Sequence, residues 1–307
     1  MVVVSLPDMS WVERIGPVPG AELVAWDLHE LTPRADEVEV VVPPYIDPAV
    51  RFELLARLPR LGVVQLLTAG YEQVARHVPP GVRLCNAAGV HDASTAELTL
   101  SLILASLRGI PEFVRAQDDA SWLPTRIWPA LADKRVLVVG YGQVGTAIVR
   151  RLLPFEVEVT AVASRARAGD DLVEQVHGID ALPTLLPRHD IVVVIVPLTE
   201  STTGLVDASF LAAMPDGALL VNVARGKVVD TDALLAETAG GRLRAALDVT
   251  DPEPLPADHP LWRSPGVLIS PHIGGASTAF TPRAVALVQA QIEALVGGAP
   301  LRNVVVG

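Results

Sequence analysis

The chain has 307 residues, of which half are hydrophobic, and its formal net charge at pH 7 is −11. This length favours two domains, because a single hydrophobic core rarely grows beyond about 250–300 residues. The acidic balance and the lack of any Lys/Arg cluster argue against a nucleic-acid surface, since phosphate binding needs a basic stripe. The longest charge-free apolar helix candidate, Leu98–Leu107, is far shorter than the roughly 20 residues that cross a bilayer. No secretory signal pattern precedes it, so we expect a cytoplasmic protein without membrane or nucleic-acid partners.

The cysteine content limits the covalent chemistry that the chain can use. Cys85 is the only cysteine, which excludes an internal disulfide and a thiolate metal cage. We interpret it as a small buried hydrophobic residue, and the sequence predicts no metal site.

Short apolar strands alternate with helical stretches in the first 90 residues, which is typical of βαβ units and a parallel sheet. The predicted strands are Val2–Ser5, Glu22–Trp26, Val38–Val42, Leu61–Leu67 and Arg83–Asn86. Ligand loops follow the carboxyl ends of such strands. The loops Pro43–Asp47 and Thr68–Glu72 are therefore candidates for substrate contact, with plain turns as the alternative. Neither loop contains Lys or Arg, which favours a substrate with an uncharged or weakly polar tail.

A helix that is apolar on nearly every side is predicted from Ser94 to Arg108. Such a helix is buried between layers or subunits. The following stretch, Ser121–Asp133, contains two prolines and no hydrophobic period. We interpret it as a crossover loop and expect a domain boundary near Ser94.

The stretch from Val136 to Gly145 carries a dinucleotide-binding pattern. Four consecutive apolar residues, Val136–Val139, predict a strand that is buried on both faces. Gly140, Gly142 and Gly145 then give the G-x-G-x-x-G spacing, and a helical pattern follows from Gln143. Glycines at these positions permit a tight turn and a close approach of the backbone to a pyrophosphate, which the free N–H groups of the helix start would bind.

The strand–helix alternation resumes after this glycine loop, as a doubly wound nucleotide-binding domain requires. The predicted strands are Val157–Ala163, Ile191–Val196, Ala218–Val223, Arg244–Val249 and Val267–Ser270. A final helix, Thr278–Val296, is expected to return to the first domain. We thus predict a discontinuous substrate domain, residues 1–94 plus 277–307, and a dinucleotide-binding domain, residues 95–276.

Three polar clusters follow the later strands, at the sheet edge where ligands bind. They are Asn222–Gly226, Leu247–Pro254 and Ser270–Gly275. Arg225, Glu253 and His272 each have a plain structural interpretation when taken singly. Together they offer a cation for a carboxylate, an acid that orients a proton donor, and the donor itself.

With these clusters the sequence resembles the D-isomer-specific 2-hydroxyacid dehydrogenases, a family that includes glyoxylate/hydroxypyruvate reductases and phosphoglycerate dehydrogenases. The resemblance covers nearly the whole chain, and its last motifs, VPLTESTTGLV, NVARGKVVD, ALDVTDPEPLP and SPHIGG, are highly specific in this order. It implies an α/β fold of two Rossmann-like domains with parallel, doubly wound sheets. It also implies an active site in the cleft between them and a homodimer formed through the nucleotide-binding domains.

The resemblance implies a role for each matching residue. Arg225 binds the substrate carboxylate and carbonyl, His272 is the acid/base, Glu253 hydrogen-bonds that histidine, and Ala69 and Gly70 offer backbone N–H groups to the carboxylate. The expected contacts of the nicotinamide cofactor lie in the matching motifs, with Asp248 near the carboxamide. They are Gly140, Gly142, Gln143, Val144, Gly145, Ser164, Arg165, Pro197, Thr202, Ala224, Asp248 and Gly274.

The sequence departs from most NAD-using members of the family at the end of the second nucleotide-binding strand. An acid is expected there for the ribose 2′-hydroxyl, whereas this chain has Ala163 followed by Ser164, Arg165, Ala166 and Arg167. A hydroxyl and guanidinium groups suit a 2′-phosphate. We therefore favour NADP(H), with NAD(H) as the alternative if Asp170 or Asp171 folds back to the ribose.

The leading hypothesis is an oxidoreductase that transfers a hydride between NAD(P)H and a small 2-keto acid or D-2-hydroxy acid. One alternative is a non-catalytic nucleotide-sensing regulator, since one fold can serve several functions. Another is a phosphite or formate dehydrogenase on the same scaffold; the lysine of phosphite dehydrogenases is missing near Ala69. The sequence does not identify the keto acid or the physiological direction.

Overall fold

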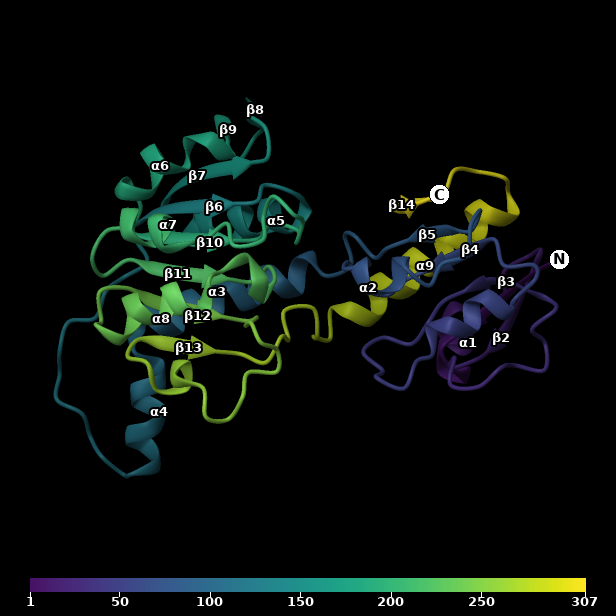
Figure 1. Cartoon of the computed structure of the whole chain (residues 1–307), viewed down its shortest axis with the longest axis horizontal. Coiled ribbons are helices and arrows are strands. Elements are labelled where there is room, and N and C mark those ends of the chain that lie inside the picture. The colour runs from purple at the N-terminus through teal and green to yellow at the C-terminus, as the bar shows by residue number, and fades with distance from the viewer. The chain divides into compact units, whose positions relative to one another are not determined.

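The computed structural model describes residues 1–307 and contains two compact units. Unit 1 comprises residues 1–91 and 278–307, and unit 2 comprises residues 92–277. Each unit has its own, mainly parallel β-sheet with helices (Figure 1). The predicted α/β fold class is therefore confirmed. None of the helices combines the length and the apolar character that a bilayer crossing would require.

The sheet of unit 1 has six strands in the order β14-β5-β4-β3-β1-β2. All neighbours pair in parallel except β14 and β5, which pair antiparallel. The strands are β1 (Val2–Leu6), β2 (Ala21–Ala25), β3 (Val38–Val41), β4 (Val63–Gln65), β5 (Arg83–Cys85) and β14 (Val304–Val306). The helices of this unit are α1 (Met9–Ile15), α2 (Glu72–Ala75) and α9 (Phe280–Val296), with a 3-10 helix at Phe52–Arg57.

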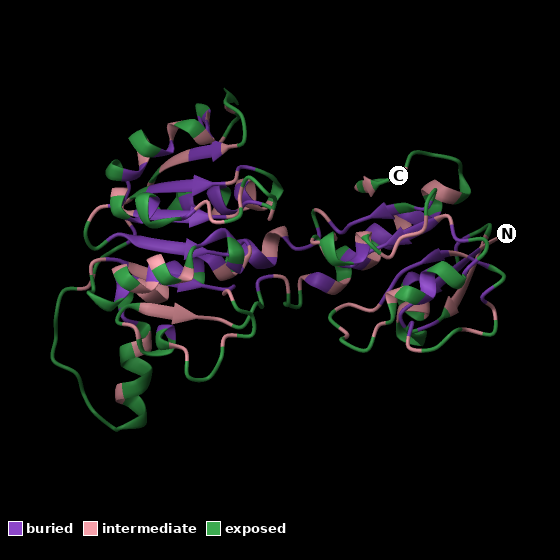
Figure 2. Ribbon diagram, viewed as in Figure 1, coloured by how far each residue is buried: buried purple, intermediate pink, exposed green.

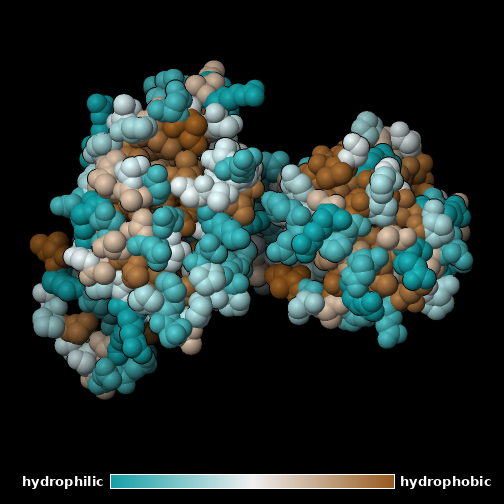
Figure 3. All heavy atoms as spheres, in the orientation of Figure 1, coloured by the Kyte–Doolittle hydropathy of each residue, from teal (hydrophilic) through white to brown (hydrophobic).

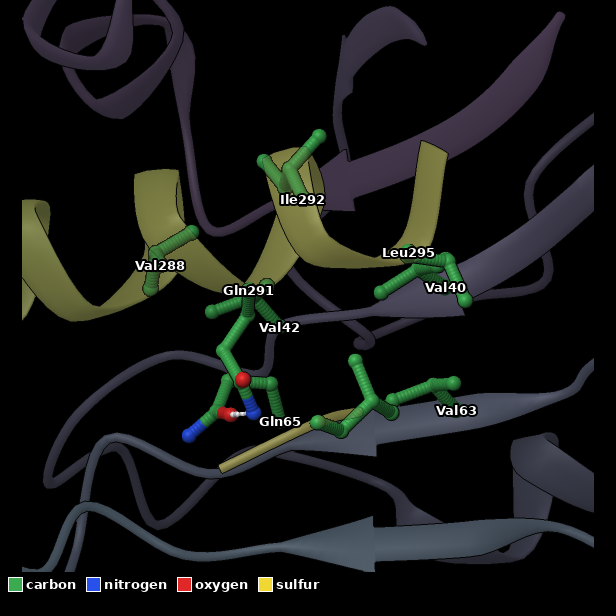
Figure 4. Close-up of a pocket in the computed structure, with 9 residues that line it drawn as sticks. Val40, Val42, Val63, Gln65, Val288, Gln291, Ile292 and Leu295 are labelled. Atoms are coloured by element: carbon green, nitrogen blue, oxygen red, sulfur yellow. Dashed lines mark hydrogen bonds between the residues drawn. The ribbon is translucent and has the colours of Figure 1, made fainter. Parts of the chain in front are cut away.

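The C-terminal helix α9 is fixed to the sheet of unit 1 by a buried glutamine pair. The side-chain amide of Gln291 donates to the side-chain oxygen of Gln65 at 2.7 Å and to the backbone oxygen of Arg302 at 2.9 Å. Figure 4 shows the two glutamines meeting beside a small cavity that is otherwise lined by aliphatic side chains. Because buried amides need hydrogen-bond partners, this pair specifies how α9 lies on the sheet.

The sheet of unit 2 has eight strands in the order β13-β12-β11-β10-β6-β7-β9-β8. Only β8 and β9 pair antiparallel. The strands are β6 (Arg135–Val139), β7 (Glu158–Ala163), β8 (Arg167–Ala168), β9 (Gln175–Gly178), β10 (Ile191–Val194), β11 (Leu219–Asn222), β12 (Arg244–Leu247) and β13 (Val267–Ile269). The helices are α3 (Asp92–Arg108), α4 (Ile110–Asp118), α5 (Gln143–Leu152), α6 (Leu182–Leu185), α7 (Ala208–Ala213) and α8 (Thr231–Ala239).

The central strand β6 is buried on both faces, as its apolar run predicts. Val136 and Val138 belong to one hydrophobic cluster, and Leu137 and Val139 belong to the cluster on the other face. All four side chains are fully buried, and the central strands of unit 2 are coloured accordingly in Figure 2. Since successive side chains of a strand point to opposite faces, helices must cover both sides of this sheet.

The segment between α3 and β6 differs from the prediction and exposes apolar side chains. The sequence pattern predicts a helix that ends at Arg108, but a second helix, α4, follows it and buries none of its residues. In the irregular stretch beyond α4, the side chains of Trp122 and Ile127 are 97% and 100% exposed. Figure 3 shows hydrophobic residues on this part of the surface.

Three short strands were not predicted: β8, β9 and β14. The sequence pattern predicts no strand at these residues. They contain two, four and three residues, respectively. Such short segments show too little periodicity to be recognised, and their pairing depends on neighbouring strands.

Candidate active site

The glycine loop of unit 2 joins β6 to α5 and has the geometry of a phosphate cradle. Gly140 has φ of 115°, and a Cβ atom there would lie 2.1 Å from the backbone oxygen of Ile195. A Cβ atom at Gly145 would lie 2.0 Å from the backbone oxygen of Gly140. Only glycine is therefore compatible with these two positions.

The third glycine of the loop leaves room for a ligand. Gly142 is the N-cap of α5, no side chain caps this helix end, and a Cβ atom at Gly142 would meet nothing within 4 Å. The first N–H groups of the helix, at Gln143, Val144 and Gly145, have no partner within the helix. Open space beside uncapped N–H groups at the positive end of a helix dipole suits the pyrophosphate of a dinucleotide.

The turn after β7 contains the residues expected at the ribose of the cofactor. Ser164 and Arg165 are exposed, and neither side chain makes a hydrogen bond or an ion pair. The carboxylate of Asp170, which could serve an NAD ribose, accepts the hydroxyl of Tyr141. The turn therefore presents a hydroxyl and a guanidinium group to solvent.

Pro197 and Thr202, two further expected cofactor contacts, are joined by the hydroxyl group of Thr202. The Thr202 hydroxyl donates to the backbone oxygen of Pro197 at 2.6 Å and accepts the N–H of Thr199 at 2.8 Å. These bonds fix the loop that follows β10. Ala224, which follows β11, is 2% exposed.

Arg225 follows β11, and a buried asparagine holds its backbone. The side chain of Asn222, 1% exposed, donates to the backbone oxygen of Arg225 at 3.0 Å and accepts the N–H of Ala224 at 3.1 Å. A Cβ atom at Gly226 would lie 1.8 Å from the backbone oxygen of Thr250, so the loops after β11 and β12 touch. The sequence analysis did not single out Asn222, although a polar residue ending an apolar strand is a usable signal.

His272 and Glu253 form a hydrogen-bonded pair. Nδ1 of His272 lies 2.6 Å from Oε1 of Glu253, and the two side chains are 45% and 41% exposed. A carboxylate can only accept, so Nδ1 carries the hydrogen and Nε2 is left for another partner. Glu253 follows β12 and His272 follows β13. Because β11, β12 and β13 are parallel neighbours, Arg225, Glu253 and His272 lie at one sheet edge.

The loop that carries His272 is held by Asp248, which is 3% exposed. Its carboxylate accepts the Ser270 hydroxyl at 2.6 Å, the N–H of Ile273 at 2.9 Å and the N–H of Gly274 at 2.8 Å. His272 itself has φ of 52°, a conformation that costs energy outside glycine and persists only when its surroundings impose it. Asp248 therefore fixes the histidine loop from both sides of His272.

The two loops of unit 1 that are candidates for substrate contact differ in how free their groups are to bind a ligand. The N–H groups of Ala69 and Gly70 donate no hydrogen bond, whereas their backbone oxygens accept from Asn86 and Thr68. Tyr45 is stacked on Phe280 with a centroid distance of 4.1 Å. Leu67, which immediately precedes the second loop, is 1% exposed and belongs to the core.

Comparisons with known proteins identify the family of this chain. The sequence model of the family described as "D-isomer specific 2-hydroxyacid dehydrogenase, NAD binding domain" matches residues 100–274. The human glyoxylate reductase/hydroxypyruvate reductase is 34% identical over 224 residues, which cover 71% of this chain and 68% of the human protein. The glyoxylate reductase of Thermofilum pendens is 34% identical over 254 residues, covering 80% and 75% of the two chains.

Among solved structures, a D-isomer specific 2-hydroxyacid dehydrogenase of Xanthobacter autotrophicus Py2, crystallised with NADPH and MES, superimposes with a TM-score of 0.82. It is 31% identical, and the match covers 99% of this chain and 98% of that one.

Proposed function

Since this chain belongs to the D-isomer-specific 2-hydroxyacid dehydrogenases, oxidoreductases that act on CH–OH groups, we propose that it reduces small 2-keto acids of the glyoxylate and hydroxypyruvate type. His272 is the proposed acid/base, Glu253 its orienting acid, and Arg225 the group that binds the substrate carboxylate. The observation that carries this proposal is the 2.6 Å bond between His272 and Glu253. It leaves Nε2 of His272 as the free proton donor at the strand edge that also carries Arg225.

The chemistry of keto-acid reduction explains why these residue types are needed. The nicotinamide cofactor, when bound, supplies the hydride that reaches the carbonyl carbon. Negative charge then builds on the carbonyl oxygen, and the imidazolium of His272 donates its Nε2 proton to that oxygen. The carboxylate of Glu253 stabilises the charged imidazole before this transfer and keeps its ring oriented.

Arg225 serves the other end of the substrate. A guanidinium group is planar and always charged, so it can hold a carboxylate by two hydrogen bonds and fix the direction of the carbonyl. The unpaired N–H groups of Ala69 and Gly70 are the proposed further donors to the carboxylate. The tail of the substrate is proposed to be uncharged or weakly polar.

NADPH is the proposed cofactor. The cradle at Gly142, together with Gln143, Val144 and Gly145, suits the pyrophosphate. The unpartnered Ser164 and Arg165 suit a 2′-phosphate, and no carboxylate precedes them in the turn. The Xanthobacter relative was crystallised with NADPH, which supports this assignment. The proposed contacts at Pro197, Thr202, Ala224, Asp248 and Gly274 extend from the ribose toward the nicotinamide.

The test is a panel of 2-keto acids, assayed by the absorbance of NADPH and of NADH at 340 nm. We expect the highest kcat/KM for glyoxylate, hydroxypyruvate or a larger apolar keto acid with NADPH. A phosphorylated keto acid as the best substrate would contradict the proposed tail. Absence of turnover with every keto acid would favour a regulatory role, and turnover of formate or phosphite with NAD would favour that class of dehydrogenase.

We further propose that the protein is a homodimer formed through unit 2 and located in the cytoplasm. The exposed apolar side chains of α4 and of the following stretch, including Trp122 and Ile127, support a partner on this surface. A second copy of the chain is the proposed partner. Sedimentation equilibrium should give twice the 32.5 kDa chain mass, and Trp122→Ser with Ile127→Ser should shift the protein toward the monomer. Fractionation of cells expressing the chain tests the location.

A further inference from the structure

A hydrogen bond links the glycine loop to the hairpin formed by β8 and β9. The hydroxyl of Tyr141, the second residue of the glycine loop, donates to both carboxylate oxygens of Asp170, at 2.9 and 3.0 Å. Oδ1 of Asp170 also accepts the N–H of Leu172 at 2.9 Å and of Val173 at 3.3 Å. The tyrosine ring is packed in the hydrophobic core and is 5% exposed. A buried ring therefore extends its polar end to a carboxylate at the surface.

A second bond runs from the hairpin back to the glycine loop. Nη2 of Arg167 donates to the backbone oxygen of Tyr141 at 2.7 Å, and its guanidinium carbon lies 5.8 Å from the centre of the tyrosine ring. Arg167 lies two residues after Arg165 and is the first residue of β8. The guanidinium group of Arg167 is thereby held against the loop that is proposed to cradle the cofactor phosphates.

Asp170 is thus an acidic side chain of the hairpin turn that is hydrogen-bonded to the glycine loop. We propose that Tyr141 and Asp170 determine cofactor specificity, because the tyrosine hydroxyl holds the carboxylate away from the ribose while Arg167 lies against the loop. Tyr141 and Asp170 are positioning residues, and Arg167 joins Ser164 and Arg165 as a partner of the 2′-phosphate. This inference rests on the proposed NADPH preference and names the residues that create it.

The charge of the Asp170 carboxylate explains why holding it away from the ribose would favour NADP over NAD. A free carboxylate near the ribose would accept from the 2′-hydroxyl of NAD and repel the 2′-phosphate of NADP. A carboxylate that already accepts a hydroxyl and two N–H groups has fewer lone pairs to offer. Burial, and next the bond to Asp170, raise the pKa of Tyr141 to about 12. The hydroxyl therefore keeps its proton at any pH at which the enzyme would be assayed.

The experiment measures binding of two small ligands that differ only in the 2′-phosphate: adenosine 2′,5′-bisphosphate and 5′-AMP. Calorimetry gives the Kd of each for the wild type and for Tyr141→Phe, which removes only the hydroxyl. We expect the wild type to prefer the bisphosphate. In Tyr141→Phe this preference should fall by roughly 2- to 12-fold, the range that one hydrogen bond spans.

Asp170→Asn is the matched control, because its amide oxygen can still accept the Tyr141 hydroxyl but the charge is gone. Here the preference for the bisphosphate should stay or rise. Arg167→Gln should lower the preference by removing a cation, and it provides the test at an exposed position if Tyr141→Phe fails to fold.

The outcomes distinguish a failure of the NADPH proposal from a failure of the proposed role of Tyr141 and Asp170. A wild type that binds both ligands equally overturns the NADPH proposal and this inference with it. A wild type that prefers the bisphosphate, with an unchanged preference in Tyr141→Phe or in Arg167→Gln, overturns only the inference. Equal weakening of both ligands by Tyr141→Phe would mean that the hydroxyl merely supports the fold.

Discussion

The loop that carries His272 and the turn that carries Ser164 and Arg165 follow strands of the same sheet but are held very differently. The histidine loop is fixed by the buried carboxylate of Asp248, which accepts three hydrogen bonds from it. The turn is exposed, and the side chains of Ser164 and Arg165 make no hydrogen bond or ion pair. Its only links to the glycine loop are those of Arg167 and Asp170.

This difference separates two tasks. A proton donor must meet its target within a few tenths of an ångström, so its loop needs rigid support. A charged group that recognises a phosphate at the surface tolerates more freedom, since its attraction acts over a longer distance. We expect that substitutions in the turn alter the choice of cofactor without altering the free energy of unfolding, whereas substitutions beneath the histidine loop alter both turnover and stability.

The largest effect is expected from His272→Ala, which removes the proposed proton donor. The value of kcat should fall roughly 10²- to 10⁴-fold, as for the loss of general acid catalysis. Because the side chain is 45% exposed, the thermal midpoint should change little. Stopped-flow measurement of NADPH oxidation provides the rate. A variant that turns over within a few fold of the wild type would exclude His272 from the mechanism.

Asp248→Ala should affect both activity and stability, because it leaves two N–H groups and one hydroxyl of the histidine loop without their acceptor. An unsatisfied buried donor, here the N–H of Gly274, costs about 1–3 kcal/mol, and the two part-buried donors cost less. Urea denaturation should therefore show a clear loss in the free energy of unfolding, together with a lower kcat. Ser270→Ala is the matched control, since it removes only one of these bonds. If Asp248→Ala is as stable as the wild type, Asp248 does not support the loop.

Arg165→Ala should change the choice of cofactor alone. Loss of one charged hydrogen bond to the 2′-phosphate costs on the order of 1.5–3 kcal/mol, so kcat/KM with NADPH should fall by about 10- to 150-fold. The value with NADH should stay nearly constant, and so should the unfolding midpoint. Equal losses of kcat/KM with NADPH and with NADH would contradict the proposed role of Arg165.

The smallest effect concerns the pH dependence of stability. Burial lowers the pKa of His189, whose Nδ1 and Nε2 bond to Leu185 and Thr160. The unfolded state then binds more protons, so the free energy of unfolding should decrease as the pH falls below about 6.5. In His189→Gln this decrease should be weaker between pH 7 and pH 5.

His29 provides the opposite case, since its hydrogen bond to Asp47 raises the pKa of the imidazole. Its contribution is present at low pH and is lost as the pH rises through the folded-state pKa. His29→Gln should therefore make the loss of stability at low pH steeper. The same slope in the wild type and in both variants would refute both assignments.

The sequence alone predicts the strands of the sheet interiors well, because a strand buried on both faces needs a continuous apolar run, as in β6 and β10. It does not predict β8, whose two residues, Arg167 and Ala168, are exposed. It also missed α4, because that helix buries no residue and its apolar positions face solvent. The periodicity of the chain does not show which surface, if any, covers such a helix.

The candidate site shows the same limit. The glycine spacing and the order of Arg225, Glu253 and His272 predict which residues carry the proposed chemistry, since these residue types follow strand after strand. The supports of the site do not follow from spacing. The bond between Tyr141 and Asp170 joins two turns that are 29 residues apart, and such a partner depends on how the loops pack in three dimensions. Asn222, by contrast, bonds within its own turn, and a polar residue at the end of an apolar strand could have indicated it.

The glutamine pair of Gln65 and Gln291 has a consequence for biosynthesis. Unit 1 obtains its helix α9 and its edge strand β14 from residues 278–307, which are translated after the whole of unit 2. Until then, the nascent sheet lacks the helix that covers its aliphatic residues, while the contiguous unit 2 is already complete. We therefore expect that unit 2 can fold before α9 is made and that unit 1 is completed later, so that a chain truncated before Phe280 would leave unit 1 open to proteolysis.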